Sequence, residues 1–119
     1  MSNKVFFKTP LRCDGASGKI QDILIAPRRI VEVFGDVDNL EETEKVSRVW
    51  TFVDHHGKYY EIRDWKCTNV YDPDLPSPDD FWQSNDPTYI DICADVRLPK
   101  EDKQEFVQWV ISRLNQPQV

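Results

Sequence analysis

Two neighbouring segments rich in β-branched and aromatic residues constrain the fold most. They are VSRVWTFV (46–53) and KYYEIRDWK (58–66), and the four residues DHHG separate them. Val, Ile, Thr and aromatic residues favour strands, whereas Asp and Gly are typical of turns. The pattern therefore predicts a β-hairpin.

Loop length sets the register of this hairpin. A four-residue loop places Phe52 opposite Tyr59 and Val49 opposite Ile62, and a two-residue loop shifts the pairing. Both faces of the two segments carry apolar residues, so side-chain alternation leaves the register open.

Two strands and two helices complete the expected fold. KIQDILIA (19–26) and TYIDICADV (88–96) predict strands, and PRRIVEVFG predicts a helix over 27–34 with proline at its first position. A second helix is expected from Pro99, because one apolar stripe recurs at helical spacing. The stripe consists of Phe106, Val107, Val110, Ile111 and Leu114.

Two acidic segments interrupt these elements. DVDNLEETE (36–44) has five acids and little apolar content, which indicates a solvated connection. Its acids are candidates for binding a partner: Asp36, Asp38, Glu41, Glu42 and Glu44. YDPDLPSPDD (71–80) has three prolines and four aspartates, which predicts a long loop without regular structure.

The chain length of 119 residues fits one domain with one modest core. The expected element order is β-α-β-β-β-α. We predict an α+β fold in which the C-terminal helix packs on a small, mainly antiparallel sheet.

Composition excludes several classes of protein. The net charge of −6 disfavours direct binding to nucleic acid, because phosphate backbones attract basic surfaces. Three widely spaced cysteines suggest neither a disulfide framework nor a zinc site, and we expect no cofactor. The N-terminus has too short an apolar run for a signal peptide, and no stretch approaches the length of a membrane span. We expect a cytoplasmic protein.

No motif with a known catalytic mechanism is present. There is no GxGxxG and no GxxxxGK[ST]. His55 and His56 lie at the predicted hairpin tip, where solvent surrounds them, and a zinc site there needs a ligand from elsewhere. Arg28 and Arg29 at a helix N-terminus are either an anion site or ordinary surface charges.

Two further groups are candidate binding residues. Arg63, Asp64, Trp65 and Lys66 end the predicted hairpin and could stack on a ring and pair with charge, or they could be an ion pair beside a core tryptophan. Phe81 and Trp82 follow the proline-rich segment. They either anchor that segment on the core or form a recognition rim.

The order VEVFG, acidic gap, KVSRVW, Gly-ending turn, EIRDWK and YIDI before a terminal helix resembles small proteins of phages and other large DNA viruses. The resemblance covers roughly residues 18–114, and IRDWK is its most specific piece. It implies a virus–host context and no catalytic residue.

Two main hypotheses for the function follow. In the first, the protein is a non-enzymatic viral inhibitor whose acidic surface binds a basic surface on a host protein. In the second, it binds a small nucleotide-like ligand through Arg63, Trp65, Lys66 and Trp82. A hydrolase or lyase that uses His55 or His56 is the third and weakest reading.

Overall fold

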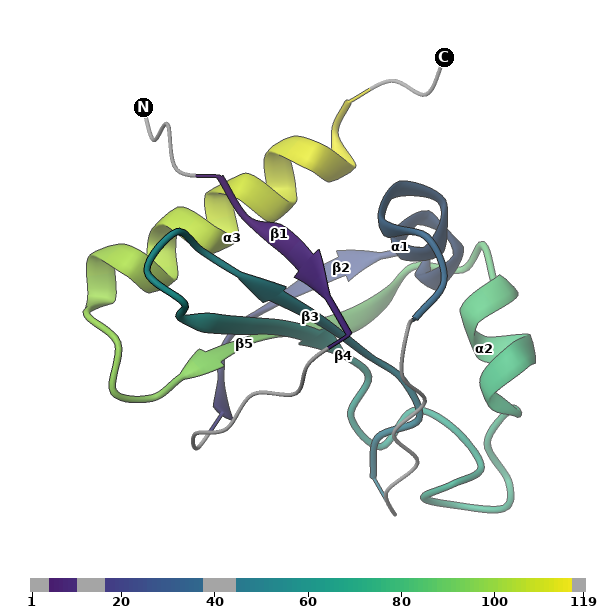
Figure 1. Cartoon of the computed structure of the whole chain (residues 1–119). Coiled ribbons are helices and arrows are strands. Elements are labelled where there is room, and N and C mark those ends of the chain that lie inside the picture. Colours follow the sequence, from purple (N-terminus) through teal and green to yellow (C-terminus); the bar gives the residue numbers. More distant parts are fainter. Residues whose placement is uncertain (1–4, 11–16, 38–44, 117–119) are drawn as a thin grey trace.

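The computed structural model describes residues 5–10, 17–37 and 45–116. Five strands form one antiparallel sheet in the order β1-β3-β4-β5-β2, so β1 and β2 are its edges (Figure 1). The strands are β1 (Phe7–Thr9), β2 (Ser17–Ile25), β3 (Val49–Val53), β4 (Tyr59–Arg63) and β5 (Thr88–Asp95).

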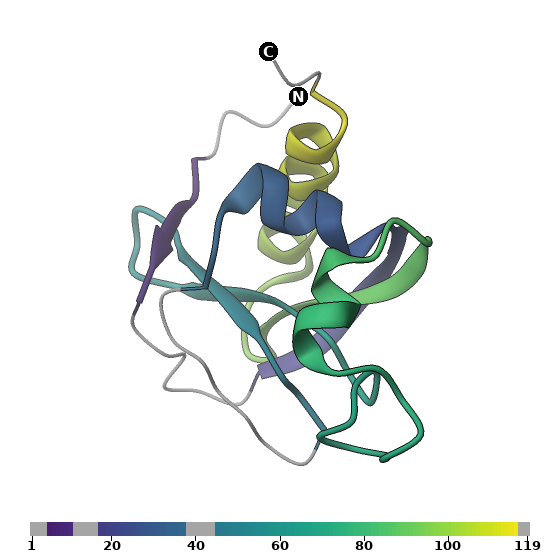
Figure 2. The same cartoon turned by 90° about the vertical axis from the view of Figure 1, so that its right-hand side faces the viewer.

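Three helices accompany the sheet: α1 (Pro27–Phe34), α2 (Pro78–Gln83) and α3 (Lys100–Leu114). Buried residues of α1 and α3 share one core with the strand residues Trp50, Phe52 and Ile62. Both helices therefore lie against the same face of the sheet, with α2 beside α1 (Figure 2). The expected α+β fold with the C-terminal helix on the sheet is confirmed.

The hairpin register differs from the pairing expected for a four-residue loop. Phe52 lies opposite Tyr60, and Val49 lies opposite Arg63. The backbone N–H of Asp54 donates to the carbonyl of Lys58 at 3.1 Å, and Gly57 has φ 73°, so three residues form the loop. The one-residue shift turns Tyr60 and Ile62, rather than Tyr59, toward the core.

Two elements were not expected. The short edge strand β1 precedes the first predicted strand, and a three-residue strand leaves too little pattern to detect. Helix α2 begins inside the segment 71–80, so the prediction of no regular structure there was wrong. Pro78 takes a first-turn position, and the Ser77 hydroxyl accepts a hydrogen bond from the backbone N–H of Asp80 at 3.2 Å.

Helix α3 buries a slightly different stripe from the expected one. Phe106, Val107, Val110 and Leu114 are buried, whereas Ile111 is 37% exposed. Trp109, on the other side of the stripe, packs against the core instead, with its ring centroid 5.4 Å from that of Phe52. The prediction that Ile111 lies in the core was therefore wrong, because Trp109 rather than Ile111 packs against the aromatic rings of the sheet.

None of the helices in the described ranges is long and apolar enough to cross a membrane.

Candidate functional site

Asp64 anchors the interior and does not face solvent. Its carboxylate is fully buried and accepts hydrogen bonds from the Ser47 N–H, the Ser47 hydroxyl and the Arg48 N–H at 2.9–3.1 Å. Burial raises the pKa of this carboxyl group, and the donors of Ser47 and Arg48 oppose the rise. Asp64 thus fixes the chain that enters β3 onto the end of β4.

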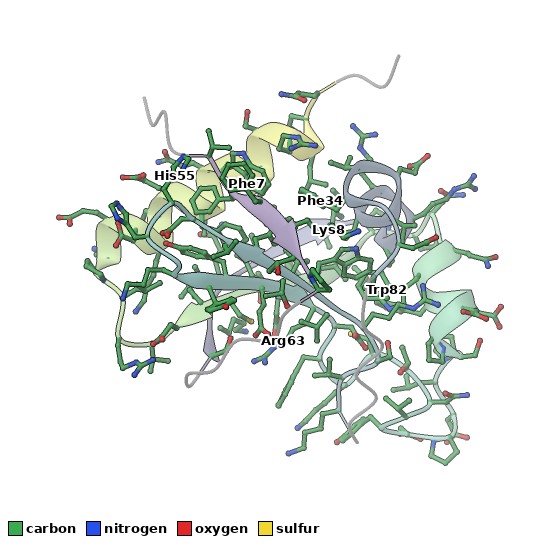
Figure 3. The ribbon with its side chains drawn as sticks, viewed as in Figure 1. Phe7, Lys8, Phe34, His55, Arg63 and Trp82 are labelled. Atoms are coloured by element: carbon green, nitrogen blue, oxygen red, sulfur yellow. The ribbon has the colours of Figure 1, made fainter. Side chains whose placement is uncertain are left out.

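Trp82 belongs to the same buried network. Its indole N–H donates to the Ser47 hydroxyl at 3.2 Å, and its ring centroid lies 4.7 Å from that of Trp50. Trp82 is 1% exposed and lies where α2 meets the sheet (Figure 3). Phe81 is 7% exposed, so both side chains anchor α2 on the core. Ser47, which joins Asp64 to Trp82, had no signal in the sequence, because a lone serine is common everywhere.

Trp65 and the cations around it lie at the surface. The Trp65 side chain is 42% exposed, and the Lys45 ammonium and Arg63 guanidinium each lie 5.5 Å from its ring centroid. Lys66 adopts φ 59°, which few non-glycine residues do, and its ammonium lies 5.2 Å from the centroid of the exposed Tyr71 ring. The structure therefore brings Arg63 to the Trp65 ring, whereas the Lys66 ammonium lies over Tyr71 instead.

Arg63 also belongs to a polar row on the sheet face opposite α3 (Figure 3). Its guanidinium lies 3.8 Å from the Glu61 carboxylate, and neighbouring β5 contributes Asp91 and Cys93. Burial raises the pKa of Asp91, while the positive charges of Lys19 and Arg63 oppose that rise. The row is a charge-compensated part of the sheet.

The two described cysteines are poor nucleophiles. Burial raises the pKa of the Cys93 thiol to about 12, and burial also raises the pKa of Cys67. A thiol protonated at neutral pH lacks the reactive thiolate.

The two histidines lie at a solvent-exposed position that does not resemble a catalytic site. His55 and His56 are exposed at the hairpin tip, where the His55 ring lies 5.4 Å from the Phe7 ring (Figure 3). Within residues 5–10, 17–37 and 45–116, no group of three or more His, Cys, Asp or Glu could hold a metal ion.

Arg29 is used inside the fold, whereas Arg28 is exposed. The Arg29 guanidinium donates to the carbonyls of Leu114 and Gln116 at 2.6–3.1 Å, and so it satisfies acceptors at the end of α3. The anion site considered at the N-terminus of α1 therefore loses one of its two cations.

The first acidic segment is only partly described. Asp36 is exposed, and its backbone carbonyl accepts a hydrogen bond from the Lys8 ammonium. The candidates Asp38, Glu41, Glu42 and Glu44 lie outside the described residues.

The second acidic segment forms what we call the acidic lobe, residues 71–87. It has five aspartates and no basic residue. Backbone hydrogen bonds shape it: the Leu75 N–H donates to the Asp72 carbonyl at 2.9 Å, and the N–H of Asn69, just before the lobe, donates to the Pro76 carbonyl at 2.8 Å. With Phe81 and Trp82 buried beneath it, the lobe presents its acids on a defined surface.

A pocket of about 520 Å³ lies against this lobe. The lobe contributes Leu75, Pro76, Asp80, Phe81, Ser84 and Asp86 to its lining. Pro27 at the start of α1, Cys67 after β4 and Thr88 at the start of β5 complete it. These segments are distant in sequence, so no local motif could have revealed the pocket.

No protein-family model matches the chain, and no curated protein matches its sequence. The resemblance to phage and viral proteins stays a prediction.

Proposed function

We propose that the protein is a non-enzymatic binding protein that docks its acidic lobe on a basic surface of a partner protein. The observation that carries the proposal is the lobe itself. Asp79 pairs with Arg48, but the other four aspartates of the lobe have no salt-bridge partner among the described residues, and two buried aromatic side chains anchor the segment that carries them. A rigid surface of one charge attracts an oppositely charged partner and loses little conformational entropy on binding.

The resemblance to viral proteins would make that partner a host protein. Binding would inhibit the host protein if the basic surface that the lobe covers is its functional site. The poorly nucleophilic cysteines and the solvated histidines support a role without catalysis.

The test compares two variants of equal net charge. The lobe variant replaces Asp74, Asp80 and Asp86 by Asn. The control variant changes three acids of other elements, as Asp22→Asn, Glu32→Gln and Glu101→Gln. Proteins from a host lysate are captured at two salt concentrations and identified by mass spectrometry.

We expect the lobe variant to lose the partners that the wild-type protein captures, whereas the control variant keeps them. Capture should also weaken with salt, because the Debye length falls from about 10 Å at 0.1 M to about 3 Å at 1 M. Equal losses of captured partners in both variants would show that capture depends only on net charge, which would refute a specific role for the lobe. Full capture by the lobe variant would also refute the proposal.

A second candidate function is binding of a nucleotide-like ligand by Arg63, Trp65 and Lys66. The half-exposed Trp65 ring with cations nearby favours it, since bases stack on aromatic rings and phosphates pair with cations. It ranks second because Lys45 and Arg63 already lie over that ring. Nucleoside monophosphates that quench the fluorescence of the wild-type protein, but not of Trp65→Phe, would establish it.

A further inference from the structure

The pocket against the acidic lobe joins apolar walls to carboxylates. Its apolar lining comes from Pro27, Leu75, Pro76 and Phe81, and two acidic residues, Asp80 and Asp86, also line it. A volume of about 520 Å³ lies in the range of pockets that hold small ligands. It can accept a long side chain together with part of the backbone that carries it.

The charges of the pocket have one sign. No Lys, Arg or His is among its lining residues. Across the part of the chain that the structure describes, neither Asp80 nor Asp86 has a salt-bridge partner, whereas their neighbour Asp79 pairs with Arg48. Two uncompensated carboxylates beside an apolar wall favour a ligand that is an alkyl chain ending in a cation.

We infer that this pocket receives a lysine or arginine side chain from the partner protein. The methylene stem lies along Leu75, Pro76 and Phe81, and the charged head lies between Asp80 and Asp86. Lysine and arginine commonly bury their stems on apolar surface while the head stays in a polar environment. The inference rests on the proposed function and adds the chemical group that the lobe selects.

The Ser84 hydroxyl supplies a further polar group at the pocket. It accepts a hydrogen bond from the backbone N–H of Asp86 at 3.1 Å, which holds Asp86 next to the end of α2. Its own proton stays available to a carbonyl of the entering chain. The pocket thus carries acceptors for a cation and a donor for a backbone.

The test titrates the ¹⁵N-labelled protein with three capped amino acids: Nα-acetyl-lysine methylamide, its arginine counterpart and its norleucine counterpart. Norleucine has the alkyl stem without the charge. We expect saturable shifts of the Leu75, Ser84 and Thr88 amide resonances with lysine and arginine, and at least tenfold weaker binding of norleucine.

Matched variants locate the effect. Asp80→Asn with Asp86→Asn should weaken binding of the lysine probe by roughly tenfold, as expected when two carboxylate contacts are lost. Glu101→Gln, on α3 and outside the pocket lining, should leave binding unchanged. Leu75→Ala should weaken the lysine and norleucine probes alike, because it shortens the apolar wall.

Equal binding of norleucine and lysine would overturn the inference, as would shifts that the pocket variants leave unchanged. Free spermidine that binds more tightly than the lysine probe would assign the pocket to a polyamine and refute a protein side chain. A lysine probe that fails to bind, while the lobe variant still loses its captured partners, would refute only the pocket. A lysine probe that binds, together with a lobe variant that keeps its captured partners, would refute the docking function and leave the pocket as a binding site.

Discussion

At the scale of single residues, the buried carboxylate of Asp64 accepts the hydrogen bonds of Ser47 and Arg48. Replacing it by Ala would leave the buried N–H groups of Ser47 and Arg48 without an acceptor, and each unpaired buried donor costs roughly 1–3 kcal/mol. We expect Asp64→Ala to lower the free energy of unfolding by at least about 2 kcal/mol in a urea titration. Asp74→Ala, at an exposed position, should change it by no more than about 0.5 kcal/mol. Similar midpoints for the two variants would contradict this account.

Tyr60 should make stability depend on pH in the alkaline range. Its buried hydroxyl donates to the Asp54 carboxylate at 2.8 Å, and burial, followed by this hydrogen bond, raises its pKa far above the ordinary value of about 10. Below about pH 10 both the folded and the unfolded chain keep the proton. Above it, only the folded chain keeps the proton, so the free energy of unfolding should fall by about 1.4 kcal/mol per pH unit.

The control for this pH dependence is Tyr60→Phe, which lacks the titrating group and keeps every other one. Its curve of unfolding free energy against pH should be flatter above about pH 10 by that same amount. Parallel curves for the wild type and Tyr60→Phe would show that the hydroxyl ionises as easily in the fold as outside it.

At the scale of elements, helix α3 distinguishes two adjacent apolar residues. Val110 is fully buried and Ile111 is 37% exposed. Val110→Ala should therefore cost about 2–3 kcal/mol through lost burial and a cavity, whereas Ile111→Ala should cost less than about 1 kcal/mol. Melting temperatures of the two variants check this, and an equal loss would mean that Ile111 is covered in solution, for example by a second copy of the chain.

Most elements were predictable from the sequence where the signals were local. Pro27 and Gly35 bracket helix α1 as expected, and the β-branched run before Pro27 forms strand β2. The hairpin register was not predictable, because it depends on Gly57 adopting a left-handed conformation and on Asp54 accepting from the N–H groups of His56 and Lys58. The Arg63–Lys66 stretch shows the same limit. Asp64 is buried, whereas Trp65 and Lys66 are exposed, and only tertiary contacts reveal that Asp64 turns inward.

At the scale of the whole molecule, the edge strand β1 closes the core through the residue before it. Phe6 is 4% exposed, with its ring centroid 5.0–5.2 Å from those of Tyr60, Phe106 and Trp109, so it joins the sheet to α3. Phe6→Ala should cost roughly 3–5 kcal/mol, a large share of the stability of a small domain. Phe7→Ala, at a neighbouring position that is 48% exposed, is the matched control and should cost far less. If thermal unfolding does not separate the two variants, β1 is not fixed to the core in solution.

The anchoring of the acidic lobe by Phe81 and Trp82 has a consequence for how such a protein can evolve. The exposed carboxylates of Asp74, Asp80 and Asp86 have no salt-bridge partner among the described residues, so most substitutions there leave the folded state about as stable as before. Selection on the lobe is therefore largely uncoupled from selection on the core. If the lobe docks on a partner that changes during evolution, the residues of this surface can change one at a time, and each successive variant stays folded.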